Sequence, residues 1–179
     1  MADVLRWVYG DTNPVVANVR ATESIEKGDL LFMEREDGFA RPFSTLVDLG
    51  SLGANQHYLA CRFLGVSGQR RRANADADPD DPTTIRVMTT GTFEFPCAAL
   101  AAVAHLGNYV GADENAAGTA VLDQQVERVA MADPDRAIAR VAKEGVVGDT
   151  TLVIRIHSAI MEGDFSDDCT TTSSSSSGA

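Results

Sequence analysis

Residues 25–33 read Ile25-Glu26-Lys27-Gly28-Asp29-Leu30-Leu31-Phe32-Met33, and residues 91–96 read Gly91-Thr92-Phe93-Glu94-Phe95-Pro96. Each stretch predicts a turn that leads into an apolar strand, because glycine adopts the backbone angles that turns need. Gly28 is placed to take a positive φ, and Asp29 is placed to bond the backbone amides of its turn. Neither stretch carries a set of side chains that performs catalysis, so both favour a scaffold or binding surface over an enzyme.

The composition bounds the class of protein. The chain has 179 residues, 44% of them hydrophobic, and is expected to form one domain with a substantial core. No apolar run approaches the roughly eighteen residues that indicate a membrane span. The start, Met1-Ala2-Asp3-Val4-Leu5-Arg6, lacks the basic and then long apolar order of a secretory signal. We therefore expect a protein that stays in the cytoplasm where it is made and has no membrane partner.

The charge and the metal-ligating residues exclude further classes. The net charge is −11, from 26 acidic and 15 basic residues, which disfavours nucleic-acid binding because phosphate contacts need clustered Lys and Arg. It suits a soluble protein or one that docks on a basic surface. The cysteines form no Cys-x-x-Cys pair and the histidines show no metal-binding spacing, so no metal and no cofactor are expected. These residues are Cys61, Cys97, Cys169, His57, His105 and His157.

The hydrophobic pattern predicts a mainly β fold. Alternating or apolar runs predict seven to nine short strands, separated by Gly, Pro, Asn and Asp turns. The clearest are residues 15–22, 30–35, 63–67, 85–90, 92–95 and 151–160, with Gly91 expected to turn the chain between two of them. Ser51 or Asn55 is placed to cap a short helix. The class is therefore a small antiparallel β-barrel or sandwich with one or two short helices and an extended N-terminal arm.

Three segments stay ambiguous, and the domain plan follows from the rest. The alanine-rich residues 97–106 are compatible with a helix or with a loop, and residues 125–130 and 136–143 with a helix or a strand. We expect an arm over residues 1–14, a β-rich domain over 15–161 and a low-complexity tail over 162–179. The tail is expected to be flexible, with ordering on a partner as the alternative.

Possible reactive motifs each fail on chemistry. The acidic run at 76–81 has Asp81 where a calcium loop needs glycine at its sixth position. Gly10-Asp11-Thr12-Asn13 resembles the nucleophile turn of self-cleaving repressors and signal peptidases, but Thr-Asn replaces Ser-Met and no lysine base is suitably placed. Lys27 also does not sit between bulky residues on a hairpin tip, as the lysine of biotinyl and lipoyl carriers does. No catalytic residue is predicted, and the chain is not expected to be an enzyme.

Three short stretches of sequence, in their order along the chain, resemble the capsid decoration, or cement, proteins of tailed bacteriophages. The stretches are Ile25 to Leu31, Gly91 to Pro96 and Leu106-Gly107-Asn108-Tyr109-Val110, followed by a closing strand over 151–156. The resemblance covers about residues 15–160. It implies a β-rich protein without catalytic residues or cofactor that binds the major capsid protein on the outer face of an icosahedral shell and stabilises the shell. It also implies self-association, expected as a homotrimer, and a location in the virion.

The aromatic N-terminal segment is the candidate contact surface. Val4, Leu5, Trp7, Val8 and Tyr9 precede the first regular strand and are hard to leave in water. They are predicted to bind the shell or a neighbouring copy, and packing on the protein's own core is the alternative. A head-fibre base or tail component is the second functional prediction, and an enzyme with an unrecognised site is the third.

Overall fold

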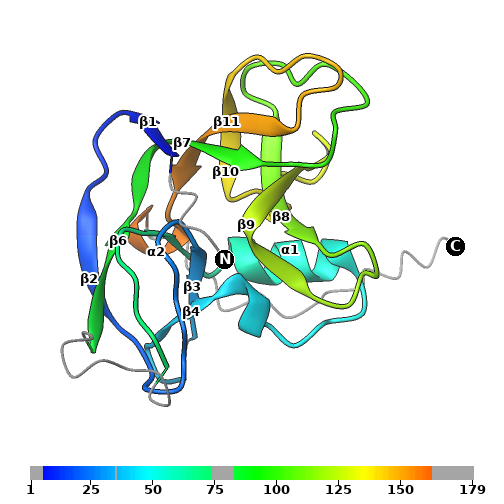
Figure 1. Ribbon diagram of the computed structural model, residues 1–179. Coiled ribbons are helices and arrows are strands. Elements are labelled where there is room, and N and C mark those ends of the chain that lie inside the picture. The colour runs from blue at the N-terminus through cyan, green and yellow to red at the C-terminus, as the bar shows by residue number, and fades with distance from the viewer. Residues whose placement is uncertain (1–5, 35, 74–82, 163–179) are drawn as a thin grey trace, which may run out of the picture.

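The computed structural model describes residues 6–34, 36–73 and 83–162. These residues form a mainly β protein of two antiparallel sheets (Figure 1). The six-stranded sheet has the order β1-β7-β11-β10-β8-β9, and the five-stranded sheet has the order β2-β6-β5-β3-β4. The strands of the first are β1 (Arg6–Tyr9), β7 (Thr90–Pro96), β11 (Thr151–His157), β10 (Ala139–Lys143), β8 (Tyr109–Glu114) and β9 (Val121–Arg128). Those of the second are β2 (Pro14–Asn18), β6 (Thr84–Met88), β5 (Phe63–Ser67), β3 (Leu30–Met33) and β4 (Ala40–Pro42).

Four short helical elements complete the described fold. The longest is α1 (Leu52–Ala60), and Ser51 caps it as predicted, accepting a hydrogen bond from the Ala54 amide at 3.3 Å. The others are α2 (Ala159–Glu162) and the 3₁₀ turns η1 (Phe43–Thr45) and η2 (Pro134–Arg136). Gln56 of α1 donates from Nε2 to the carbonyl of Ala112 in β8 and to Oε1 of Glu127 in β9. The helix is therefore tied to the end of the six-stranded sheet formed by β8 and β9.

A continuous pair of strands links the two sheets. Strands β6 and β7 are separated by one residue, Thr89, so the chain passes directly from the five-stranded to the six-stranded sheet. Strands β1 and β2 follow the same path beside them, β1 on β7 and β2 on β6. The predicted turn at Gly91 is therefore wrong, since Gly91 lies inside β7 with φ +126°. Its lack of a side chain matters because a Cβ there would lie 2.9 Å from the Phe93 ring.

Two buried clusters hold the sheets. The larger one joins both sheets, with Phe32 and Phe63 from one and Phe93 and Ile154 from the other. The Phe43 and Phe63 rings meet edge to face with centroids 5.9 Å apart, a favoured aromatic geometry. The smaller cluster belongs to the five-stranded sheet and lies on its other face: Ala17, Val19, Ile25, Leu31, Ala40, Leu64, Ile85 and Val87. Both faces of that sheet are therefore apolar, which explains why all of β5 is buried.

The described strands do not close into a barrel. The two ends of the five-stranded sheet meet at one parallel bridge, between Val19 and Ala40, and no strand ladder joins them. The barrel expected as one alternative from the sequence is thus not formed by these residues. The alanine-rich segment 97–106 is a loop, whereas residues 125–128 and 139–143 lie on strands, which resolves three ambiguities of the pattern.

Candidate partner-binding edge

Residues 6–9 form an edge strand. Strand β1 runs antiparallel to β7, with Trp7 opposite Phe93 and Tyr9 opposite Thr92, and a register shift falls between these two pairs. No strand among the described residues pairs with its other side. One row of backbone N–H and C=O groups of β1 thus faces away from the sheet, which is the usual template for adding another chain.

The side chains of β1 are unusually exposed for their chemistry. Trp7 is 54% exposed, Val8 41% and Tyr9 52%. The indole Nε1 of Trp7 donates to the carbonyl of Gly10 at 3.2 Å, so its polar atom is satisfied while its ring remains in water. Aromatic rings of this kind with few torsions carry much of the binding energy in protein interfaces. The strand therefore combines a free backbone edge with large apolar side chains.

The link from β1 to β2 is fixed to the junction between the sheets. The amides of Thr89 and Thr90 donate to the carbonyl of Thr12 at 3.0 and 3.3 Å. The hydroxyls of the same threonines donate to the carbonyls of Asn13 and Asp11, both at 2.7 Å. Four hydrogen bonds thus hold a short connection that has no regular structure. This connection gives β1 and β2 a set position relative to each other.

Strand β2 continues the exposed edge. It is the outer strand of the five-stranded sheet, and its Val16 is 70% exposed. Both strands lie on the same side of the molecule in Figure 1, in blue at its left. Beside the connection lies a hollow of about 370 Å³ whose lining includes Tyr9, Asp11, Thr92 and Arg155. We call the exposed residues Trp7, Val8, Tyr9 and Val16 the apolar edge.

The predicted contact residues divide into two groups. Trp7, Val8 and Tyr9 lie together on β1, whereas Val4 and Leu5 fall outside the described residues. The backbone of residues 6–9 pairs with the protein's own sheet, while the three side chains stay exposed. The backbone of residues 6–9 therefore belongs to the protein's own sheet, and partner binding by the exposed side chains stays a prediction.

Sequence reasoning missed Val16 and a second exposed group. Val16 is an apolar residue on the polar side of an alternating strand, which is a readable signal. The second group lies on loops after β7, β9 and β10 and consists of Leu106, Met131, Val146 and Val147. The Ala104–Gly145 bridge and a 3.7 Å contact from Asn108 Nδ2 to the Met131 sulfur bring these loops together. Their proximity depends on pairing between segments that are distant in the chain, and the hydrophobic pattern of the sequence does not reveal such pairing.

The described residues offer no metal centre and no spanning helix. Within residues 6–34, 36–73 and 83–162, no three His, Cys, Asp or Glu side chains come together as a metal-binding group. In the same ranges, every helix is too short or too polar to cross a membrane. Lys27, considered above as a carrier lysine, is exposed beside the turn at Gly28.

No protein-family model matches the chain, and no curated protein matches it significantly. The function is therefore inferred from the geometry of the apolar edge and from the residues of the sequence.

Proposed function

We propose that this chain is a structural virion protein that binds the outer surface of an assembled phage capsid and stabilises it. The observation that supports this most is the apolar edge, where Trp7, Val8 and Tyr9 are exposed on a strand with a free backbone side. A free strand edge takes up an extended segment of a partner through main-chain hydrogen bonds, and neighbouring pockets take its side chains. The resemblance of the three sequence stretches to capsid decoration proteins supports the major capsid protein as the partner.

The proposed form of the domain follows from the same features. The two sheets form a sandwich around the shared cluster of Phe32, Phe63, Phe93 and Ile154. Residues 1–14 act as an arm that is anchored on β7 through β1. The anchored part places the aromatic side chains, and the sheet behind them keeps them from collapsing onto the core. Binding the assembled shell and not its free subunits stabilises the shell by mass action.

Binding to empty shells tests the proposal. The purified protein is mixed with undecorated shells of the major capsid protein from the same virus and centrifuged through sucrose. We expect it to move with the shells in a saturable way and to raise their melting temperature, because it binds the assembled state. A protein that stays at the top of the gradient at all ratios would contradict the capsid role and leave the head-fibre or tail assignment.

Deletion of the arm is a poor version of this test. Removing residues 2–13 would delete β1 and uncover the edge of β7, which carries the buried Phe93. Loss of binding would then mix the loss of contacts with the loss of folding. Substitutions at exposed side chains of β1 avoid this problem because those side chains contribute little to the core.

A further inference from the structure

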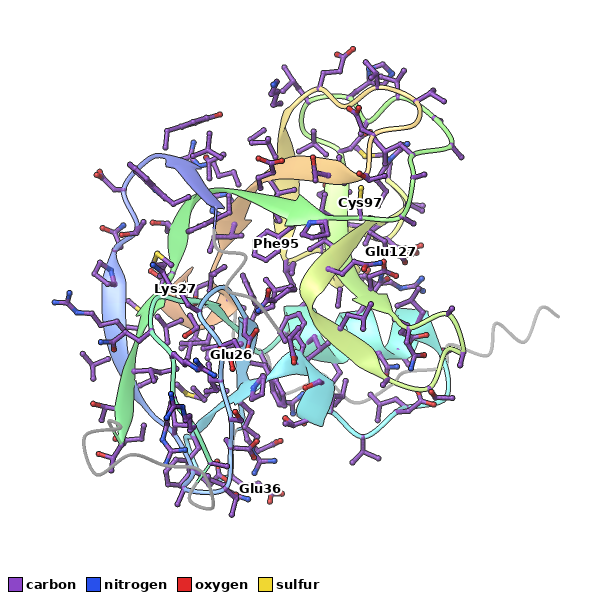
Figure 2. All side chains as sticks on the ribbon, in the orientation of Figure 1. Glu26, Lys27, Glu36, Phe95, Cys97 and Glu127 are labelled. Carbon is purple, nitrogen blue, oxygen red and sulfur yellow. The ribbon has the colours of Figure 1, made fainter. Side chains whose placement is uncertain are left out.

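The charged residues of the two sheets are unevenly distributed. Strands β8 and β9, at one end of the six-stranded sheet, carry four acids and one arginine. Figure 2 labels one of these acids, Glu127, on β9 to the right of β1 and β2. Strands β1 and β2, the strands β7 and β6 that pair with them, and β11 beyond β7 carry three arginines and one acid, Glu94. The strands around the apolar edge are therefore basic, although the net charge of the chain is −11.

Arg86 lies beside Val16 of the apolar edge. The two residues are directly opposite each other on β6 and β2. The Cβ atoms of such a pair are about 5 Å apart, and both side chains point to the same face of the sheet. Both side chains are exposed, and the Arg86 guanidinium forms no hydrogen bond or ion pair with the described residues. An unpaired cation therefore lies next to an exposed apolar side chain.

Arg155 has the same relation to Tyr9. Both residues line the hollow of about 370 Å³ beside the connection from β1 to β2. Thr92 lies between them, opposite Tyr9 on β1 and opposite Arg155 on β11. Arg155 is exposed and, like Arg86, forms no side-chain hydrogen bond or ion pair with the described residues. Asp11 lines the same hollow without forming an ion pair with Arg155.

The neighbour of Arg155 on its other side is a second arginine. Arg155 is directly opposite Arg140 of β10. Arg140 is engaged with Tyr109, because its Nη2 donates to the Tyr109 hydroxyl at 3.3 Å and its guanidinium lies 4.4 Å from the centre of the Tyr109 ring. Like charges directly opposite each other on neighbouring strands destabilise a sheet. Arg155 thus costs the free protein stability, and an anion from a partner would offset this cost.

We propose that the apolar edge binds an acidic, extended segment of its partner, and that Arg86 and Arg155 select this segment by binding its carboxylates. This inference rests on the proposed function, in which the segment belongs to the major capsid protein. A guanidinium binds a carboxylate through two parallel N–H···O bonds, which gives geometric specificity as well as attraction. The net charge of −11 taken alone favours a basic partner surface. The inference therefore predicts the opposite sign of charge for the partner at this edge.

Charge reversal tests that sign. Sedimentation with undecorated shells gives the dissociation constants of the wild type, Arg86→Glu, Arg155→Glu and the control Lys143→Glu. Lys143 is exposed at the end of β10, which β11 and β7 separate from β1, and its reversal changes the net charge by the same amount. Each arginine variant should bind at least about tenfold more weakly than the wild type, because like charges then meet at the interface. Lys143→Glu should stay within about twofold, because solvent ions screen distant surface charges.

The other outcomes separate this inference from the capsid role. Wild-type affinity in both arginine variants would overturn the inference and leave the capsid role standing, since the shells are still bound. Tighter binding by both variants would show a basic partner surface and overturn it as well. An equal loss in Lys143→Glu would assign the effect to net charge and overturn the role of the two arginines. No binding by the wild type would contradict the capsid role and the inference together.

A conservative variant covers the case in which charge reversal disturbs the fold. Arg155→Lys keeps the positive charge and introduces an amine, which a carbodiimide couples to a carboxylate in direct contact. The chain has only two lysines of its own, Lys27 and Lys143, so few other couplings compete. On shells, mass spectrometry should find a cross-link from position 155 to an Asp or Glu of the major capsid protein. A folded, shell-bound variant without this cross-link would overturn the inference.

Discussion

At the scale of single residues, Gly65 shows the closest backbone approach. It lies in β5 with φ +147°, and a Cβ there would lie 2.2 Å from the carbonyl oxygen of Met88. A real Cβ atom is essentially never found that close to another heavy atom. The obstructing oxygen belongs to the backbone of the neighbouring strand β6, which cannot shift without disturbing the pairing of β5 with β6. The sequence predicted the strand over residues 63–67 but not this contact, because Met88 of β6 lies some twenty residues further along the chain.

Substitution of Gly65 should therefore be severe. Gly65→Ala combines a backbone clash with a backbone angle that L residues avoid, and it should lower the free energy of unfolding by about 3 kcal/mol or more. Gly38→Ala is the matched control, because Gly38 has φ +68° and nothing within 4 Å of its added Cβ. That change should cost about 1 kcal/mol. Urea unfolding of both variants checks this, and equal losses would show that β5 and β6 do not approach as described.

At the scale of elements, the cap of α1 is the most direct sequence-to-structure link. Ser51→Ala removes the acceptor for the Ala54 amide and should cost about 1 kcal/mol of stability. Ser51→Asn supplies another side-chain acceptor and should stay within a few tenths of a kcal/mol of the wild type. Thermal unfolding of the pair separates capping from general effects of substitution. An alanine variant as stable as the asparagine variant would rule out a contribution from the cap.

Elements with a strong local pattern were predictable, and elements held by distant partners were not. The alternation over β11 places Leu152, Ile154 and Ile156 inward, as the sequence predicted, because one face of the strand is buried. In the 97–106 segment, Leu100 and Ala104 are buried at a spacing that also fits a helix. There the backbone instead pairs with residues 145–149, through Leu100 to Asp149 and Ala104 to Gly145. Such pairing overrides local propensity.

The apolar edge was only partly predictable from the sequence, because its exposure depends on pairing between distant strands. Trp7, Val8 and Tyr9 stand out as an aromatic segment in the sequence, so their selection needed no structure. Their exposure depends on the pairing of β1 with β7, which lies more than eighty residues away. Val16 joins them because β2 and β1 follow the β6–β7 junction, which is a property of the sheet topology.

At the scale of the whole molecule, the described residues expose two groups of apolar side chains, the apolar edge and the loop group of Leu106, Met131, Val146 and Val147. Contiguous apolar surface on a soluble domain commonly marks an interaction site. We expect self-association as a homotrimer, for which light scattering after size exclusion should give three times the 19.0 kDa mass of the chain. A mass of 19.0 kDa at all concentrations would contradict the trimer.

The central claim is that the apolar edge binds a phage shell, and the affinity of edge variants for shells tests it most directly. Sedimentation with undecorated shells gives the dissociation constants of the wild type, the double variant Trp7→Ala/Tyr9→Ala and the control Val47→Ala. Val47 is 80% exposed on the loop before α1, away from β1 and β2 in sequence.

Loss of aromatic anchors at an interface typically costs about 2 kcal/mol or more, which is about thirtyfold in affinity. The double variant should therefore bind at least about thirtyfold more weakly than the wild type, with an unchanged circular dichroism spectrum, while Val47→Ala binds normally. Wild-type affinity in the folded double variant, or no binding by the wild type itself, would contradict the account.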